Sequence, residues 1–118
     1  MSDGVLVNVD ADTGAGIVLT TVKCEKVGAR ESQIIESEVR AKAPSRKWKV
    51  VMDLKEVTLL ASMGLGMLVS LHKSCASEGG KLVVCNVGPD LMQVLKITHL
   101  ERVLKIVPDL EAAKKLVG

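Results

Sequence analysis

Ser62 is the residue of this 118-residue chain whose type and setting point most directly to chemistry. It lies between an apolar run that ends at Leu60 and an amphipathic pattern that begins near Gly64, with a further glycine at Gly66. A serine at the start of a helix lies beside backbone N–H groups without partners and at the positive end of the helix dipole. That position suits a hydroxyl that caps the helix, worth about 1 kcal/mol, and equally a hydroxyl that carries a phosphate.

The two glycines beside this serine indicate close contact with the backbone. A glycine inside a helix costs up to about 1 kcal/mol relative to alanine. Two in one turn therefore predict that the backbone there closely approaches the chain's own sheet or a partner. Leu65 and Met67 would supply an apolar contact next to the serine. The expected partner-binding surface consists of Ala61, Ser62, Met63, Gly64, Leu65, Gly66 and Met67.

Other chemistries at Ser62 have less support in the spacing. The histidines, His72 and His99, lie on different predicted elements, and neither forms a recognisable triad with Ser62 in the sequence. His72 also has no second ligand at a metal-binding offset. The third glycine of a dinucleotide fingerprint would fall at Val69. We expect no enzyme, no cofactor and no metal, and binding of a small anion or nucleotide at the helix start stays open as an alternative.

Composition narrows the classes of partner. The chain is 47% hydrophobic and 25% charged, which is ordinary for one globular domain over residues 1–118. Its net charge of +2 is too small to predict a nucleic-acid or membrane surface. Trp48 is the single aromatic residue besides histidine, so bases have no aromatic platform. We expect a protein partner, and neither nucleic acid nor a membrane.

Cysteine usage and the apolar runs indicate a compartment. Cys24, Cys75 and Cys85 are an odd number of cysteines without close pairing, which predicts reduced thiols. No stretch reaches the roughly 18 apolar residues that span a bilayer, and the N-terminus lacks the pattern of a signal peptide. These features predict a cytoplasmic protein.

The first part of the chain predicts a β-hairpin. The runs 5–9 and 16–24 are rich in β-branched residues. Asp10 and Asp12 between them match the first ligands of a calcium loop, but Gly14 comes one place early and no glutamate closes the set. We therefore expect a turn there and no calcium site.

Helices and strands then alternate, which calls for parallel strands joined by right-handed crossovers. In the first helix, Glu36 precedes Arg40 and Glu38 precedes Lys42 by four residues, a spacing expected for ion pairs on its solvent face. The expected fold is a small mixed β-sheet with an N-terminal antiparallel hairpin and βαβ units, with helices packed mainly on one side. The expected elements are helix 29–43, strand 47–54, helix 64–78, strand 81–87, helix 89–97, strand 101–107 and helix 108–116.

Residues 50–68, 79–85 and 94–100 together resemble the STAS domain of the anti-sigma factor antagonist type. The resemblance extends from about Trp48 to the C-terminus and implies a single STAS-like domain. It also implies a bacterial regulatory function, in which the domain binds a kinase-type anti-sigma factor or a related switch protein.

The resemblance further implies control by phosphorylation. In the family, the kinase modifies the first serine of an Asp-Ser-Ser/Thr-Gly-Leu-Gly motif, and that serine falls on Ser62. The glycines and leucine of the motif fall on Gly64, Leu65 and Gly66. Ala61 replaces the aspartate of the motif, and Met63 replaces its second hydroxyl residue.

Three hypotheses follow for residues 61–67. The first is a protein-interaction domain that is switched by phosphorylation of Ser62. The second is a subunit of a signalling assembly that uses the same surface without modification. The third is a domain that binds a nucleotide or another small anion. The sequence does not indicate an oligomeric state.

Overall fold

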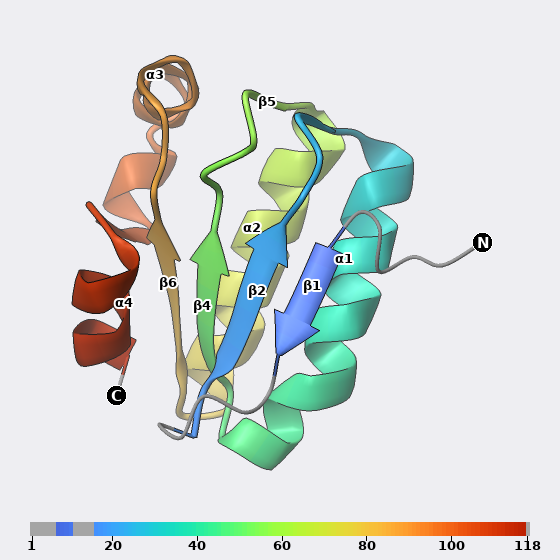
Figure 1. Cartoon of the computed structure of the whole chain (residues 1–118), viewed down its shortest axis with the longest axis vertical. Coiled ribbons are helices and arrows are strands. Elements are labelled where there is room, and N and C mark those ends of the chain that lie inside the picture. Colours follow the sequence, from blue (N-terminus) through green and yellow to red (C-terminus); the bar gives the residue numbers. More distant parts are fainter. Residues whose placement is uncertain (1–6, 11–15, 118) are drawn as a thin grey trace.

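The structure, a computed structural model, describes residues 7–10 and 16–117. A five-stranded sheet has the order β1-β2-β4-β6-β7, in which β1 is antiparallel to β2 and every other pair is parallel (Figure 1). β4 is therefore the central strand, as its apolar sequence predicts. The strands are β1 (Val7–Asp10), β2 (Val18–Val22), β4 (Lys49–Asp53), β6 (Lys81–Cys85) and β7 (Lys105–Val107).

Helices connect the parallel strands, because a parallel pair needs a long crossover. In chain order the connecting helices are α1 (Ala29–Lys42), α2 (Ser62–Ser77) and α3 (Pro89–Ile97), and α4 (Leu110–Val117) follows the last strand. Short 3-10 helices, η2 (Ala43–Arg46) and η3 (Leu100–Arg102), follow α1 and α3. A separate pair of two-residue parallel strands, β3 (Lys26–Val27) and β5 (Leu59–Leu60), lies beside the start of α2.

The mixed fold and the N-terminal hairpin are confirmed, and two expectations need comment. The predicted strand 101–107 is too long, because the N–H groups of Arg102 and Leu104 bond back to His99 and Leu100 and so do not pair with the sheet. Of the predicted strand, only β7 forms. It lies at the edge of the sheet, as the polar start of residues 101–107 predicts. The turn that contains Asp12 and Gly14 lies outside the described residues.

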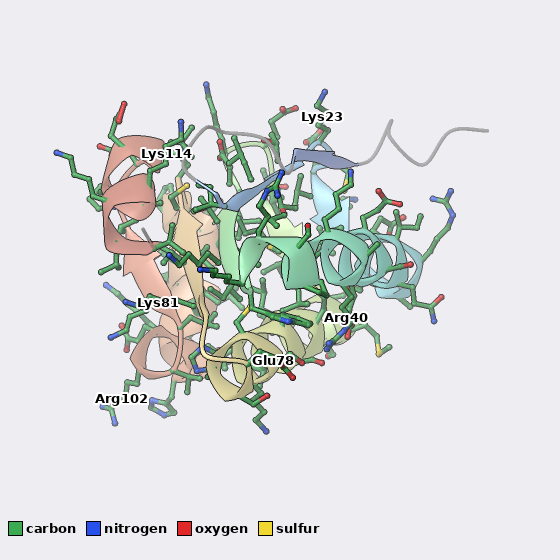
Figure 2. The ribbon with its side chains drawn as sticks, turned by 90° about the horizontal axis from the view of Figure 1, so that it is seen from below. Lys23, Arg40, Glu78, Lys81, Arg102 and Lys114 are labelled. Atoms are coloured by element: carbon green, nitrogen blue, oxygen red, sulfur yellow. The ribbon has the colours of Figure 1, made fainter. Side chains whose placement is uncertain are left out.

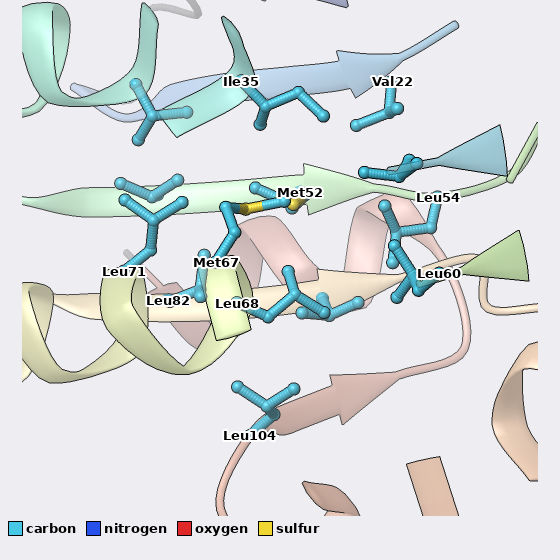
Figure 3. Close-up of a cluster of buried hydrophobic side chains, with 14 of the residues drawn as sticks. Val22, Ile35, Met52, Leu54, Leu60, Met67, Leu68, Leu71, Leu82 and Leu104 are labelled. Atoms are coloured by element: carbon cyan, nitrogen blue, oxygen red, sulfur yellow. The ribbon is translucent and has the colours of Figure 1, made fainter. Parts of the chain in front are cut away.

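The sheet carries a core on each face because successive side chains of a strand point to opposite sides. From β4, Val50 and Met52 pack in the larger cluster with residues of α1, α2 and α3. Val51 points the other way and packs with Ala113 and Val117 of α4. Figure 3 shows Met52 at the centre of the larger cluster. Most helices therefore cover one face, and α4 covers the other.

Arg40 joins α1 to α2 through a polar network (Figure 2). Its Nε donates to Glu36 Oε2 at 2.9 Å, while Nη1 and Nη2 donate to Ser74 and Ser70 Oγ, each at 2.9 Å. Ser70 Oγ also donates to Glu36 Oε2 at 3.2 Å. The expected Glu36–Arg40 ion pair is present, but it faces α2 rather than open solvent. The planar guanidinium suits this fixed fork of donors.

Thr20 offers a test of the core of the sheet. Its Oγ1 is buried and has no hydrogen-bond partner among the described residues. Since a buried hydroxyl without a partner is unfavourable, Thr20→Val should raise the free energy of unfolding by about 1 kcal/mol. The matched control is Thr98→Val, which removes a 2.8 Å bond from Oγ1 to the Val94 carbonyl and should lower stability. Urea denaturation measures both, and a less stable Thr20→Val protein would contradict the expectation.

Thiol reactivity should separate the cysteines. Burial raises the pKa of Cys75 to about 11, with Arg40 acting against it, and burial with the charges of Asp53 and Asp109 raises that of Cys85 to about 12. Burial and the charge of Glu31 also raise the pKa of the half-buried Cys24.

A raised pKa lowers the thiolate fraction at a given pH, and the thiolate is the nucleophile. We expect N-ethylmaleimide at pH 8 to modify Cys24 first in the folded protein, at a rate that increases with pH. All thiols should react together in urea. Intact-mass spectrometry counts the adducts, and equal rates in the folded protein would refute this assignment.

Candidate partner-binding surface

Ser62 is the first residue of α2, directly after β5. β5 pairs with β3, and the Ala61 N–H continues this contact by donating to the Val27 carbonyl at 2.9 Å. Ala61 is thereby held in an extended conformation and becomes the N-cap residue, without a side-chain cap. Of the two alternatives for Ser62, a hydroxyl that caps the helix is therefore wrong. Its hydroxyl is not used as the cap and lies on an exposed residue.

Gly64 explains why the start of α2 can lie so close to the small sheet. A Cβ at this position would be 3.0 Å from the Val27 carbonyl oxygen and 3.0 Å from Leu60 Cδ2. A Cβ at Gly66, by contrast, would meet no atom within 4 Å, and Gly66 is exposed. Gly64 therefore serves close packing within the chain, whereas the packing of the chain does not require Gly66.

The exposed apolar side chains differ from those expected. Met67 is only 3% exposed and packs in the larger core cluster, so the prediction that it offers an outward contact is wrong. Leu65 is half-buried against the same cluster. Met63 and Leu59 are 54% and 48% exposed instead, on either side of Ser62 in the chain. These two residues provide the apolar part of the surface.

Leu59 is the surface residue that sequence reasoning missed. It precedes Leu60, and neighbouring residues of a strand point to opposite faces. Leu60 is buried, so Leu59 points away from the core. Reading residues 59–60 with a period of two, and not as one apolar run, could have found it.

Charge at the start of α2 comes from the backbone. The first turn contains no acidic side chain, and its leading N–H groups have no partners inside the helix. The positive end of the helix dipole is therefore not neutralised by a carboxylate of that turn. A negative group on Ser62 would be stabilised in this position.

His72 is too far from Ser62 along α2 to act as its general base. His72 lies ten residues further along the same helix, which is about 15 Å at 1.5 Å per residue. His99 follows α3, a different element. Among residues 7–10 and 16–117, no group of three or more His, Cys, Asp or Glu side chains could hold a metal ion. None of the helices in these ranges is both long enough and apolar enough to cross a membrane.

Comparison with known proteins identifies the family. The pattern that defines the STAS domain matches residues 15–113, so the chain belongs to the STAS domain family. A STAS-domain containing protein of Pseudomonas aeruginosa is 33% identical over 58 residues, which cover 49% of this chain and 57% of that protein. The anti-sigma F factor antagonist of Paenibacillus polymyxa is 30% identical over 57 residues, covering 48% of this chain and 49% of its own. The chain thus matches only about half the length of these relatives.

Solved structures share the whole fold. The crystal structure of protein TM1081 from Thermotoga maritima superimposes with a TM-score of 0.80 at 20% identity, covering 98% of this chain and 97% of its own. The anti-sigma factor antagonist SpoIIAA in its unphosphorylated form has a TM-score of 0.72 at 10% identity, covering 93% and 95%. SpoIIAA from Bacillus has also been solved in a phosphorylated form, with a TM-score of 0.64 at 12% identity and coverage of 93% and 98%. This chain is a STAS domain with the fold of the anti-sigma factor antagonists.

The two glycines of α2 should respond differently to alanine. Gly66→Ala should raise the free energy of unfolding by up to about 1 kcal/mol, because alanine favours the helix and the space is open. Gly64→Ala should lower it, because the added methyl group presses on the Val27 backbone. Thermal and urea denaturation compare the pair directly, and an equal gain from both substitutions would refute the packing role of Gly64.

Proposed function

We propose that this STAS domain is a regulatory adaptor that binds a kinase-type anti-sigma factor, or a related switch protein, through the start of α2. The proposed contact surface is the exposed part of residues 59–66, with Ser62 as the site of phosphorylation. The exposed Ser62 between Leu59 and Met63 is the observation that carries this proposal. The family, and relatives that are anti-sigma factor antagonists, support it.

The apolar side chains favour a protein partner over a small ligand. Leu59 and Met63 are about half exposed although both are large and apolar. Burying such side chains against a partner is favourable, and methionine adapts to different surfaces. The exposed Gly66 leaves open space on α2, so a partner's backbone can approach this helix closely. The surface therefore suits an apolar contact centred on a hydroxyl.

Phosphorylation of Ser62 would act on the complex and not on the fold. A phosphate adds a charge of about −1.5 to −2 at pH 7. Within the domain this charge lies at the positive end of α2, beside free N–H groups, so the domain tolerates it. At an apolar interface the same charge would have to be buried, which is costly. The modified domain should stay folded and release its partner.

Ala61 and Met63 support a second candidate function. The family motif has an acidic residue and a second hydroxyl residue at these positions, and neither is present here. A chain that keeps the apolar surface, but not the motif residues on either side of the phosphorylated serine, can serve as an unmodified subunit of a signalling assembly. Ser62 would then be a contact residue only.

Substitutions at Ser62 should separate folding from binding. Ser62→Asp should change the free energy of unfolding by less than about 1 kcal/mol, because the new carboxylate is at the helix N-terminus. Affinity capture from the source cells, quantified by mass spectrometry, should recover a kinase-type partner with the wild-type chain and Ser62→Ala. Recovery with Ser62→Asp and with Met63→Glu should fall by about tenfold or more.

The matched control is Ser37→Asp, which places the same charge on an exposed residue of α1. It should leave capture unchanged. If Ser62→Asp captures the same partner as fully as Ser62→Ala, the switch is refuted. Intact-mass measurement of the chain from its own cells then decides between the two candidates, since phosphate on Ser62 would refute the unmodified subunit.

A further inference from the structure

We propose a second interaction surface: the groove beside β7 binds an extended, acidic segment of a protein partner, which adds a strand to the open edge of the sheet. This edge groove is formed by α3, η3 and β7 and shares no lining residue with segment 59–66. The inference is therefore independent of the proposed function of Ser62.

The edge groove is large enough for a short peptide. Its main hollow has a volume of about 470 Å³, and a second hollow of about 230 Å³ adjoins it. Met92 and Ile106 line both hollows, so these two side chains form an apolar floor where the hollows adjoin. Val103, another lining residue, is 41% exposed. Apolar side chains of a peptide would cover this floor.

The sheet edge provides the backbone partners. β7 pairs with β6 on one side and ends the sheet on the other. In a parallel strand, alternate N–H and C=O groups point away from the neighbour, so those of β7 are available to another strand. β7 has three residues, which is about 10 Å of pairing. A segment of three to four extended residues is the matching length.

The charged side chains that line the edge groove favour an acidic peptide segment. Lys96, Arg102 and Lys105 line the main hollow, and Glu101 is the one acidic residue among its lining side chains. Figure 2 shows Arg102 at the margin of the molecule, pointing away from its body. An acidic segment complements this rim of charged side chains. A second copy of β7 would bring like charges together, so edge pairing between two copies of this chain is disfavoured.

A peptide titration tests the proposal. The probe is a fluorescein-labelled heptapeptide, Glu-Glu-Val-Ile-Val-Glu-Glu, whose apolar centre matches the floor and whose ends match the rim. Fluorescence anisotropy should show saturable binding that weakens as salt is added. The corresponding peptide with lysine in place of glutamate should bind at least about tenfold more weakly, because the rim repels it. An acidic peptide with N-methylated central residues should lose binding, because it cannot pair with the edge.

Variants of the chain locate the site. Arg102→Glu with Lys105→Glu should weaken binding of the acidic peptide by about tenfold. Lys73→Glu, at an exposed lysine of α2, is the matched control and should have no effect. Ser62→Asp should also have no effect, so loss of peptide binding and failure of the Ser62 switch are distinguishable. Amide shifts in an NMR titration should be largest at Lys105–Val107.

Several results would overturn the proposal. The acidic peptide could fail to bind the wild-type chain saturably. The N-methylated peptide could bind as tightly as the unmodified acidic peptide, or the amide shifts could be centred away from β7. Unchanged affinity in the Arg102→Glu, Lys105→Glu protein would overturn it as well. The peptide comparisons use the wild-type chain, so the test does not depend on how the double variant folds.

Discussion

The carbonyl oxygen of Val27 is the contact on which the candidate surface depends. It accepts the Ala61 N–H at 2.9 Å and would lie 3.0 Å from any Cβ at Gly64. The first contact holds Ala61 extended, so that α2 begins at Ser62. The second favours glycine at position 64, because an added Cβ would press on this backbone. Together they direct Ser62 away from the small sheet.

The position of α2 relative to the sheet decides which of its side chains a partner can reach. Met63 and Met67 are four residues apart and so share a helix face. One is 54% exposed and the other 3%, because the first turn extends past the tips of the central strands (Figure 1) while the next turn packs on them. Met52 and the residues around it hold that second turn in place. Arg40 ties the same helix to α1.

The two proposed surfaces use different physical means of recognition. Segment 59–66 presents apolar side chains around a hydroxyl, so a phosphate there changes the cost of burial. The edge groove presents cations and the open edge of β7, so it depends on charge and backbone hydrogen bonds. STAS domains that carry both kinds of surface could contact two partners, or two parts of one partner, at the same time.

The sequence by itself determined the alternation of strands and helices, the hairpin, the central position of β4 and the family. Those features follow from periodicity, turn residues and a local motif, and each of these involves residues that are close together in the sequence. Only the tertiary structure decided that Ala61 is the helix cap, that Met67 is buried, that Leu59 is exposed and that Arg40 faces α2. Each depends on which distant segment packs against the residue, and the packing of α2 on β3 brings together residues that are more than thirty positions apart in the chain.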